Sequence, residues 1–192
     1  MNGNIRHFPR LAIGQRLMAM VAVFCLASSG VSAAQQEKSP PGDIPDSQVF
    51  ISYQSPLGLS LKVPEGWART ERDDGARFAD KFNAVDLSLT QVAAAPSLES
   101  AKAVEVPVLV NTGDKVEPGK VESVTLKGGP AIRIRYTSDS EANPVTHRQL
   151  RLEHERYLFF HDGRQAALDL SAPVGADNAD QWRLMANSLR WN

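Results

Sequence analysis

Residues 129–136 read Gly-Pro-Ala-Ile-Arg-Ile-Arg-Tyr. Ile132, Ile134 and Tyr136 alternate with two arginines, so apolar and charged side chains point to opposite sides of an extended chain. The glycine and proline mark a turn, and Val124 and Leu126 alternate in the same way before it. The pattern predicts antiparallel strands with one buried and one solvated face.

The same alternation predicts strands elsewhere in the chain. The shorter ones are expected at 49–53, 57–63, 76–78 and 85–89. A long strand is expected from about Gln149 to Phe160, and Asp162-Gly163 has the residues that a two-residue hairpin turn requires. Its return strand should end before Pro173, which gives a mainly antiparallel sheet.

Two helices are predicted beside this sheet. Ser97 is a candidate N-cap for a helix that continues to about Val106, where Pro107 ends or kinks it. A second helix begins near Asp177-Asn178 and places apolar residues, Trp182 among them, at helical spacing. The predicted fold class is α+β, with a central antiparallel β-sheet whose buried face is covered by helices.

The N-terminal segment has the pattern of a secretory signal. Three arginines and no acid precede the apolar run 17–27, and small residues follow up to Ala33. We therefore expect a signal peptide over residues 1–33, cleavage near Ala33, and a periplasmic or secreted protein. The next stretch, 34–46, is rich in proline and polar residues and predicts a flexible linker before a single domain over 47–192.

Composition excludes several classes of function. The chain has 21 basic and 22 acidic residues in interspersed order, so it has no basic surface of the kind that binds nucleic acid. No second apolar segment follows the run 17–27, so we expect no membrane insertion after processing. Cys25 is the only cysteine and lies inside the apolar run, so the processed protein is expected to have no disulfide or thiolate metal ligand.

Three stretches together resemble a known family. They are the strand end Val63-Pro64-Glu65-Gly66-Trp67, the strand at 129–136, and the terminal Asn187-Ser188-Leu189-Arg190-Trp191. In this combination the chain is similar to the PsbP-like family of small exported bacterial proteins. The resemblance implies a PsbP-like α/β sandwich used as a binding or assembly module, and it transfers no site residue to this sequence.

Metal binding is a first chemical hypothesis, with His154, His161 and Asp162 as weak candidates, because imidazole and carboxylate groups together suit divalent cations. On a strand, however, Glu153 and Glu155 point away from His154, and His161 also lies on the face opposite to it. We expect a charged, solvated surface here. The face of this strand that carries its apolar residues also carries His154 and Arg156, which predicts a bulge or partial exposure near its middle.

Hydrolysis is a second hypothesis, in which Ser138 or Ser140 would act with His147 and Asp139. No nucleophile-elbow motif surrounds either serine, so local turns are the expected role of these residues. A third hypothesis is a pocket for a small apolar ligand lined by Trp67, Trp182 and Trp191, although tryptophans at element ends are usually core residues.

The polar connection 137–146 is longer than a hairpin needs, and such loops often carry binding surfaces. Asp139, Glu141, Asn143 and His147 are therefore the candidate partner-binding residues. The leading hypothesis is a non-enzymatic exported envelope protein that binds or stabilises a protein partner, without a cofactor. Alternatives are a carrier or sensor of a small apolar ligand and a metal-dependent or hydrolytic enzyme.

Overall fold

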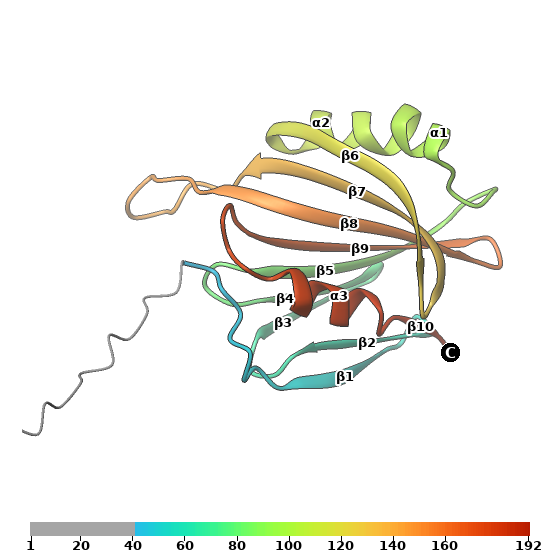
Figure 1. Ribbon diagram of the computed structural model, residues 1–192, viewed down its shortest axis with the longest axis horizontal. Coiled ribbons are helices and arrows are strands. Elements are labelled where there is room, and N and C mark those ends of the chain that lie inside the picture. Colours follow the sequence, from blue (N-terminus) through green and yellow to red (C-terminus); the bar gives the residue numbers. More distant parts are fainter. Residues whose placement is uncertain (1–40) are drawn as a thin grey trace, which may run out of the picture. The chain divides into compact units, whose positions relative to one another are not determined.

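The structure is a computed structural model that describes residues 41–192 (Figure 1). The signal peptide expected over 1–33, Cys25 and the first part of the expected linker lie outside the described residues. Within residues 41–192, no helix has the length and apolar character that crossing a membrane requires.

A small sheet holds three antiparallel strands in the order β1-β2-β10. They are β1 (Phe50–Ser55), β2 (Leu59–Pro64) and β10 (Arg190–Trp191). The predicted hairpin of the first two strands is confirmed. Its buried face is shorter than predicted, because Tyr53 is buried whereas Val49 and Ile51 remain 56% and 46% exposed.

A larger sheet has seven antiparallel strands in the order β3-β4-β5-β9-β8-β7-β6. Its members are β3 (Ala68–Arg72), β4 (Gly75–Ala79), β5 (Ala84–Gln91), β6 (Asp114–Leu126), β7 (Gly129–Asp139), β8 (Arg151–His161) and β9 (Arg164–Pro173). The hairpin turn predicted between β8 and β9 is confirmed, since Asp162 and Gly163 adopt φ values of 46° and 72°. The predicted central antiparallel sheet is therefore present.

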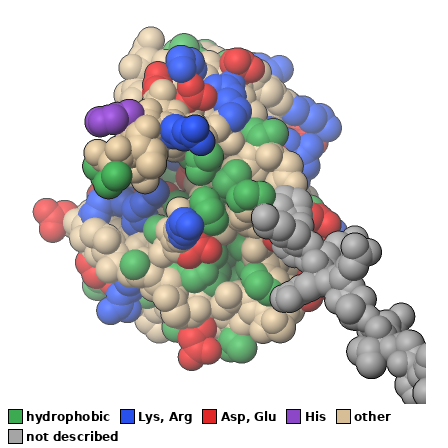
Figure 2. Space-filling view, turned by 90° about the vertical axis from the view of Figure 1, so that its left-hand side faces the viewer, with side chains coloured by type: hydrophobic (Ala, Val, Ile, Leu, Met, Phe, Trp, Pro, Cys, Tyr) green, Lys and Arg blue, Asp and Glu red, His purple; other side chains and the backbone are tan. Residues whose placement is uncertain are grey.

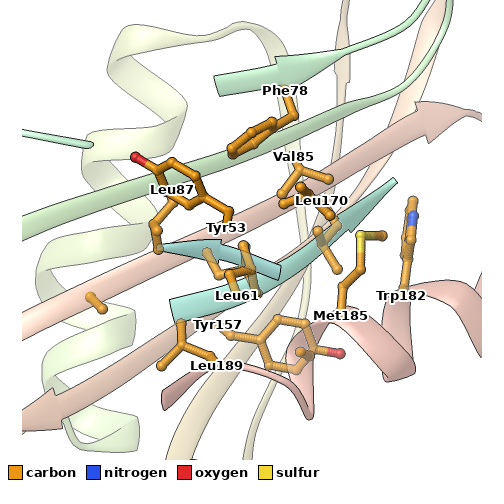
Figure 3. Packing of buried hydrophobic residues seen from close by; sticks show 14 of the residues in the cluster. Tyr53, Leu61, Phe78, Val85, Leu87, Tyr157, Leu170, Trp182, Met185 and Leu189 are labelled. Atoms are coloured by element: carbon orange, nitrogen blue, oxygen red, sulfur yellow. The ribbon is translucent and has the colours of Figure 1, made fainter. Parts of the chain in front are cut away.

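The main core lies between the small sheet, helix α3 (Ala179–Ala186) and one face of the large sheet (Figure 3). Trp182 and Met185 of α3 point toward Leu170 of β9, and Leu189 closes the same cluster. Tyr53 of β1 meets Phe78 of β4 edge to face, with ring centroids 5.0 Å apart. The predicted second helix thus packs its apolar stripe into this core.

The opposite face of the large sheet contacts a continuous helical segment. It consists of α1 (Leu98–Ser100), a π-helical turn η1 (Ala101–Glu105) and α2 (Val106–Thr112). Ser97 caps it as predicted: its side chain accepts from the Ser100 N–H, and Ser100 Oγ accepts from the Ser97 N–H. Fully buried Ala101 packs on Ile132, Ile134 and other apolar residues of the sheet.

One expectation about these elements is wrong. The first helix does not end near Val106 but continues through Pro107 to Thr112, directly after the π-helical turn η1. For β8 the structure shows the second of the two predicted alternatives: its register with β7 and β9 is continuous, without a bulge, and His154 and Arg156 are partly exposed. His154 and Arg156 both contact Asp169 inside the protein, although Arg156 Nε has no hydrogen-bond partner among the described residues.

The final residues of the predicted linker are packed rather than flexible. Ile44 is 4% exposed, and its N–H donates to the side-chain oxygen of Asn178 at 2.7 Å. Asn178 Nδ2 donates back to the carbonyl of Gly42, and Gln181 Nε2 donates to the carbonyl of Ile44. These bonds attach residues 42–44 to the start of α3, where a flexible tether was expected.

Candidate functional site

A buried carboxylate lies under the helical segment on the face of β7, β8 and β9. Asp169 of β9 accepts a hydrogen bond from Tyr136 Oη at 2.7 Å, and His154 Nδ1 lies 2.9 Å from its other oxygen. Arg156 Nη1 approaches the carboxylate to 3.4 Å. Burial alone would raise the pKa of Asp169, but the hydrogen bond and charge of His154, with Arg156 and Tyr136, outweigh it and hold that pKa below its ordinary value.

The polar chain continues from His154 to a serine. Ser138 Oγ lies 2.9 Å from His154 Nε2, while the imidazole stacks on the Tyr136 ring with centroids 4.2 Å apart. Burial, followed by the charge of Asp169, raises the pKa of the Tyr136 hydroxyl, so this group stays a neutral donor. Ser138, His154 and Asp169 thus have the hydrogen-bond order of a catalytic triad.

Other contacts give this network a structural role. Glu105 of the π-helical turn accepts from Gln165 Nε2 at 2.9 Å and lies 3.9 Å from Arg156. The network therefore ties the helical segment to the sheet. Ser138 is only 8% exposed, and a substrate carbonyl needs access to the nucleophile. The geometry accordingly favours a polar core network over an open active site.

The serine hypothesis based on sequence named the wrong partners. Ser138 bonds with His154, which in turn bonds with Asp169, whereas His147 lies on the loop and Asp139 bonds with Lys115 and Arg151. A signal for the missed carboxylate was present, because Asp169 interrupts the apolar run Ala166–Leu170. A single acid in such a strand needs buried partners, and this requirement could have directed attention to it.

The structure does not bring the metal candidates together. His154 faces Asp169 under the helical segment, whereas His161 lies near Trp191 on the other side of the sheet, with ring centroids 5.4 Å apart. Within the described part of the chain, the one acidic partner of His161 is exposed Asp162, at 3.2 Å. Among residues 41–192, no cluster of three or more His, Cys, Asp or Glu side chains is arranged to hold a metal ion.

Residues 140–150 form an ordered ribbon that extends the β7–β8 hairpin. Ser140 N–H donates to the carbonyl of Leu150, and Asn143 N–H donates to the carbonyl of Arg148. At the tip, Asn143 Oδ1 accepts from the N–H groups of Val145 and Thr146 at 2.9 Å each. We refer to residues 140–150 as the ribbon.

The four partner-binding candidates have different environments. Asp139 joins Lys115 at 2.6 Å and Arg151 at 3.2 Å, so it fastens β6, β7 and β8 at their ends. The side chain of Asn143 is used in the turn. Glu141 and His147 are exposed and remain available for a partner, with His147 at a positive φ of 53°.

The ribbon forms one side of a surface groove of about 800 Å³. The β4–β5 connection forms the other side, and Arg72 and Arg77 pair with Asp86 on its floor at 2.5 and 2.6 Å. We call this hollow the ribbon groove. Figure 2 faces this end of the molecule, where basic, acidic and apolar side chains all reach the surface.

Two cations of the ribbon groove lack a carboxylate partner among the described residues. Lys81 Nζ lies 4.9 Å from the centre of the Phe82 ring, and Arg148 uses only its backbone in hydrogen bonds. Leu150, at the base of the ribbon, contributes apolar surface and is 42% exposed, and exposed Pro144 lines the groove near the tip. The groove therefore combines unpaired positive charge with exposed apolar side chains.

A smaller hollow of about 360 Å³ lies beside Trp182, between α3 and strands β6 to β8. Its rim carries the charged residues Arg135, Glu153 and Glu155. Trp182 itself is 7% exposed and belongs to the core. This hollow is an open depression whose apolar lining is bordered by charged side chains, and it is not the enclosed cavity that usually holds a small apolar ligand.

Comparison with known proteins identifies the fold. No family model and no curated protein matches the sequence. Among solved structures, cyanobacterial PsbP from Synechocystis sp. PCC 6803 has a TM-score of 0.50 at 13% identity, over 79% of this chain and 98% of that one. The Ran-binding protein Mog1p of Saccharomyces cerevisiae has a TM-score of 0.50 at 12% identity, over 74% of this chain and 95% of that one.

A protein from Bacteroides thetaiotaomicron also has a TM-score of 0.50, at 11% identity over 73% of this chain. This chain spans 48% of the length of that protein. At such identities the likeness concerns the backbone arrangement and carries no chemistry from one protein to another. The resemblance noted in the sequence is confirmed at this level: the chain has the PsbP-like fold.

Proposed function

We propose that this protein is an exported, non-enzymatic module that binds a protein partner through the ribbon groove. The observation that carries the proposal is the groove itself, with the unpaired cations Lys81 and Arg148 beside exposed apolar side chains. Charged groups around an apolar centre are typical of protein interfaces. The binding role named for the yeast Mog1p supports a protein partner in general terms.

The charged residues of the ribbon groove indicate what kind of partner surface would bind there. Asp80 is occupied, because its Oδ1 accepts from the N–H groups of Phe82 and Asn83 at 2.7 and 2.6 Å. Asp86 is neutralised by two arginines. A partner segment with carboxylate and apolar side chains would therefore complete the ion pairs of the groove, and such complementarity favours both recognition and fast association.

Site-specific photo-crosslinking in the host tests this proposal. A photoreactive amino acid is introduced at Glu141 or Thr146, which line the groove, and at Lys102, which is exposed on the helical segment. We expect one discrete protein adduct from both groove positions and none from Lys102. Equal adducts at all three positions, or none, would refute the assignment of this surface.

Hydrolysis is a second candidate because of one specific observation, the hydrogen-bonded order Ser138, His154, Asp169. A fluorophosphonate probe distinguishes the two functions, since it labels only an accessible and activated serine. Labelling that disappears in Ser138→Ala would support the enzyme. Because Ser138 is buried, we expect the native protein to remain unlabelled.

A further inference from the structure

Strand β1, at the edge of the small sheet, lacks the protective features that both edge strands of the large sheet have. Natural proteins protect exposed strand edges with charges, prolines and bulges, because free backbone groups recruit other strands. Edge strand β3 carries three charged residues among its five, and edge strand β6 contains Pro118 and two register shifts. Strand β1 reads Phe-Ile-Ser-Tyr-Gln-Ser and has none of these protections.

The hydrogen-bond pattern between β1 and β2 shows which backbone N–H and C=O groups of β1 have no partner on β2. Lys62, which faces Ser52, donates its N–H to Ser188 Oγ on the far side of β2, so this pair exchanges no hydrogen bond. The carbonyl of Val49, just before β1, in contrast accepts from the N–H of Glu65, just after β2. Because this pattern alternates along an antiparallel strand, Phe50, Ser52 and Gln54 direct their N–H and C=O groups outward.

No other described element occupies that side. β1 lies at the outer border of the molecule in Figure 1, and it pairs only with β2. Among residues 41–192, no hydrogen bond engages the backbone groups of Phe50, Ser52 or Gln54 from outside the small sheet. Ile51 points to the same side of the sheet as buried Tyr53 and yet is 46% exposed, so the described residues cover its side chain only in part.

We propose that β1 pairs antiparallel with β1 of a second copy of this chain, joining the two small sheets. In the register centred on Ser52, Phe50 faces Gln54 of the second copy, and Ser52 faces Ser52. The two strands then exchange about six backbone hydrogen bonds. Exposed Ile51 gains Tyr53 of the second copy as its cross-strand neighbour, a favourable pair of β-branched and aromatic residues.

The sequence of β1 itself argues for a copy of this chain as the occupant. The strand has no charged residue, so self-pairing places no like charges opposite each other. A two-fold axis through Ser52 also makes the contact self-complementary and closed, which limits assembly to a dimer. The surface is separate from the ribbon groove, and the inference does not depend on the function proposed above.

Sedimentation of the purified protein tests the dimer over concentrations from about 1 μM to about 1 mM. We expect a reversible monomer–dimer equilibrium that Ser52→Lys weakens at least tenfold, because two lysines would meet at the axis. The matched control is Thr70→Lys on edge strand β3, which should leave the equilibrium unchanged. A monomer at all concentrations, or a dimer that Ser52→Lys does not weaken, overturns the proposal.

A thiol at the axis tests the register. Directly opposed residues of such a pair have Cα atoms about 5.5 Å apart, which a disulfide can bridge. In a Cys25→Ser background, Ser52→Cys should oxidise to a covalent dimer. Gln54→Cys should not, since its counterpart would lie four residues along the strand, about 13 Å away. Equal crosslinking of both variants would contradict the register.

Discussion

His154 Nδ1 lies 2.9 Å from Asp169 Oδ1, and this contact joins two neighbouring strands beneath the helical segment. Both residues occupy positions in which the strand pattern calls for apolar side chains. Buried polar groups are tolerated only when their hydrogen-bonding capacity is filled, and Tyr136, Ser138 and Arg156 fill it here. The network thus fixes the position of the helical segment on the sheet.

The first prediction concerns Asp169→Asn, which keeps the shape of the side chain but removes its charge. The amide keeps one acceptor oxygen, but its NH2 group would face a donor and Arg156 would lose its negative partner in a buried environment, so we expect the free energy of unfolding to fall by about 2–4 kcal/mol. Urea denaturation measures the change. The control Asp180→Asn alters an exposed ion pair with Arg183 and should cost under about 0.5 kcal/mol. A loss below about 1 kcal/mol at Asp169 would show that the network is not structural.

The second prediction concerns a close backbone approach at Gly75. A Cβ at this position would lie 1.9 Å from the carbonyl oxygen of Leu87, so β4 and β5 would have to move apart. We expect Gly75→Ala to lower the free energy of unfolding by about 3 kcal/mol or more. Gly175→Ala is the control, because nothing lies within 4 Å there and only the φ of 92° resists the change. Similar thermal midpoints of the two variants would contradict the close packing.

The third prediction is a pH dependence. Lys120 and then Arg133 lower the pKa of Glu122 from 4.5 to about 2. A carboxylate with a depressed pKa in the folded state stabilises the protein above its unfolded pKa, and this stabilisation is lost as the pH falls toward the folded one. Native protein should therefore be more stable than Glu122→Gln by about 1 kcal/mol near neutral pH.

The difference between native protein and Glu122→Gln should shrink between pH 4.5 and about 2. Chemical denaturation at several pH values measures it. A difference that stays constant over this window would mean that the ion pairs with Lys120 and Arg133 do not hold Glu122 ionised.

Much of the fold follows from the sequence alone. The alternation at Ile132, Ile134 and Tyr136 predicts β7, and Asp162-Gly163 predicts the β8–β9 turn. Strand β3 could not be recognised, because all five of its residues are exposed and it has no apolar parity. The first half of β6 is equally hidden, since its residues are mostly exposed and two register shifts interrupt the pattern.

The site was less predictable than the fold. Sequence separation concealed the pairing of Ser138, His154 and Asp169, which depends on the strand order β7-β8-β9. The sequence did not predict the π-helical turn either, in which Ala101 is buried against the sheet and Glu105 accepts from Gln165. The ribbon, in contrast, was identified from its length, although only the structure shows that Asp139 and Asn143 are occupied by internal contacts.

The central claim, partner binding at the ribbon groove, is tested most directly by the affinity of the crosslinked partner for Arg148→Glu. The side chain of Arg148 makes no hydrogen bond among the described residues, so the variant should fold normally. We expect its Kd to rise at least tenfold, about 1.4 kcal/mol, whereas Lys127→Glu at the exposed β6–β7 turn should bind like the native protein. An unchanged Kd for Arg148→Glu would contradict the account.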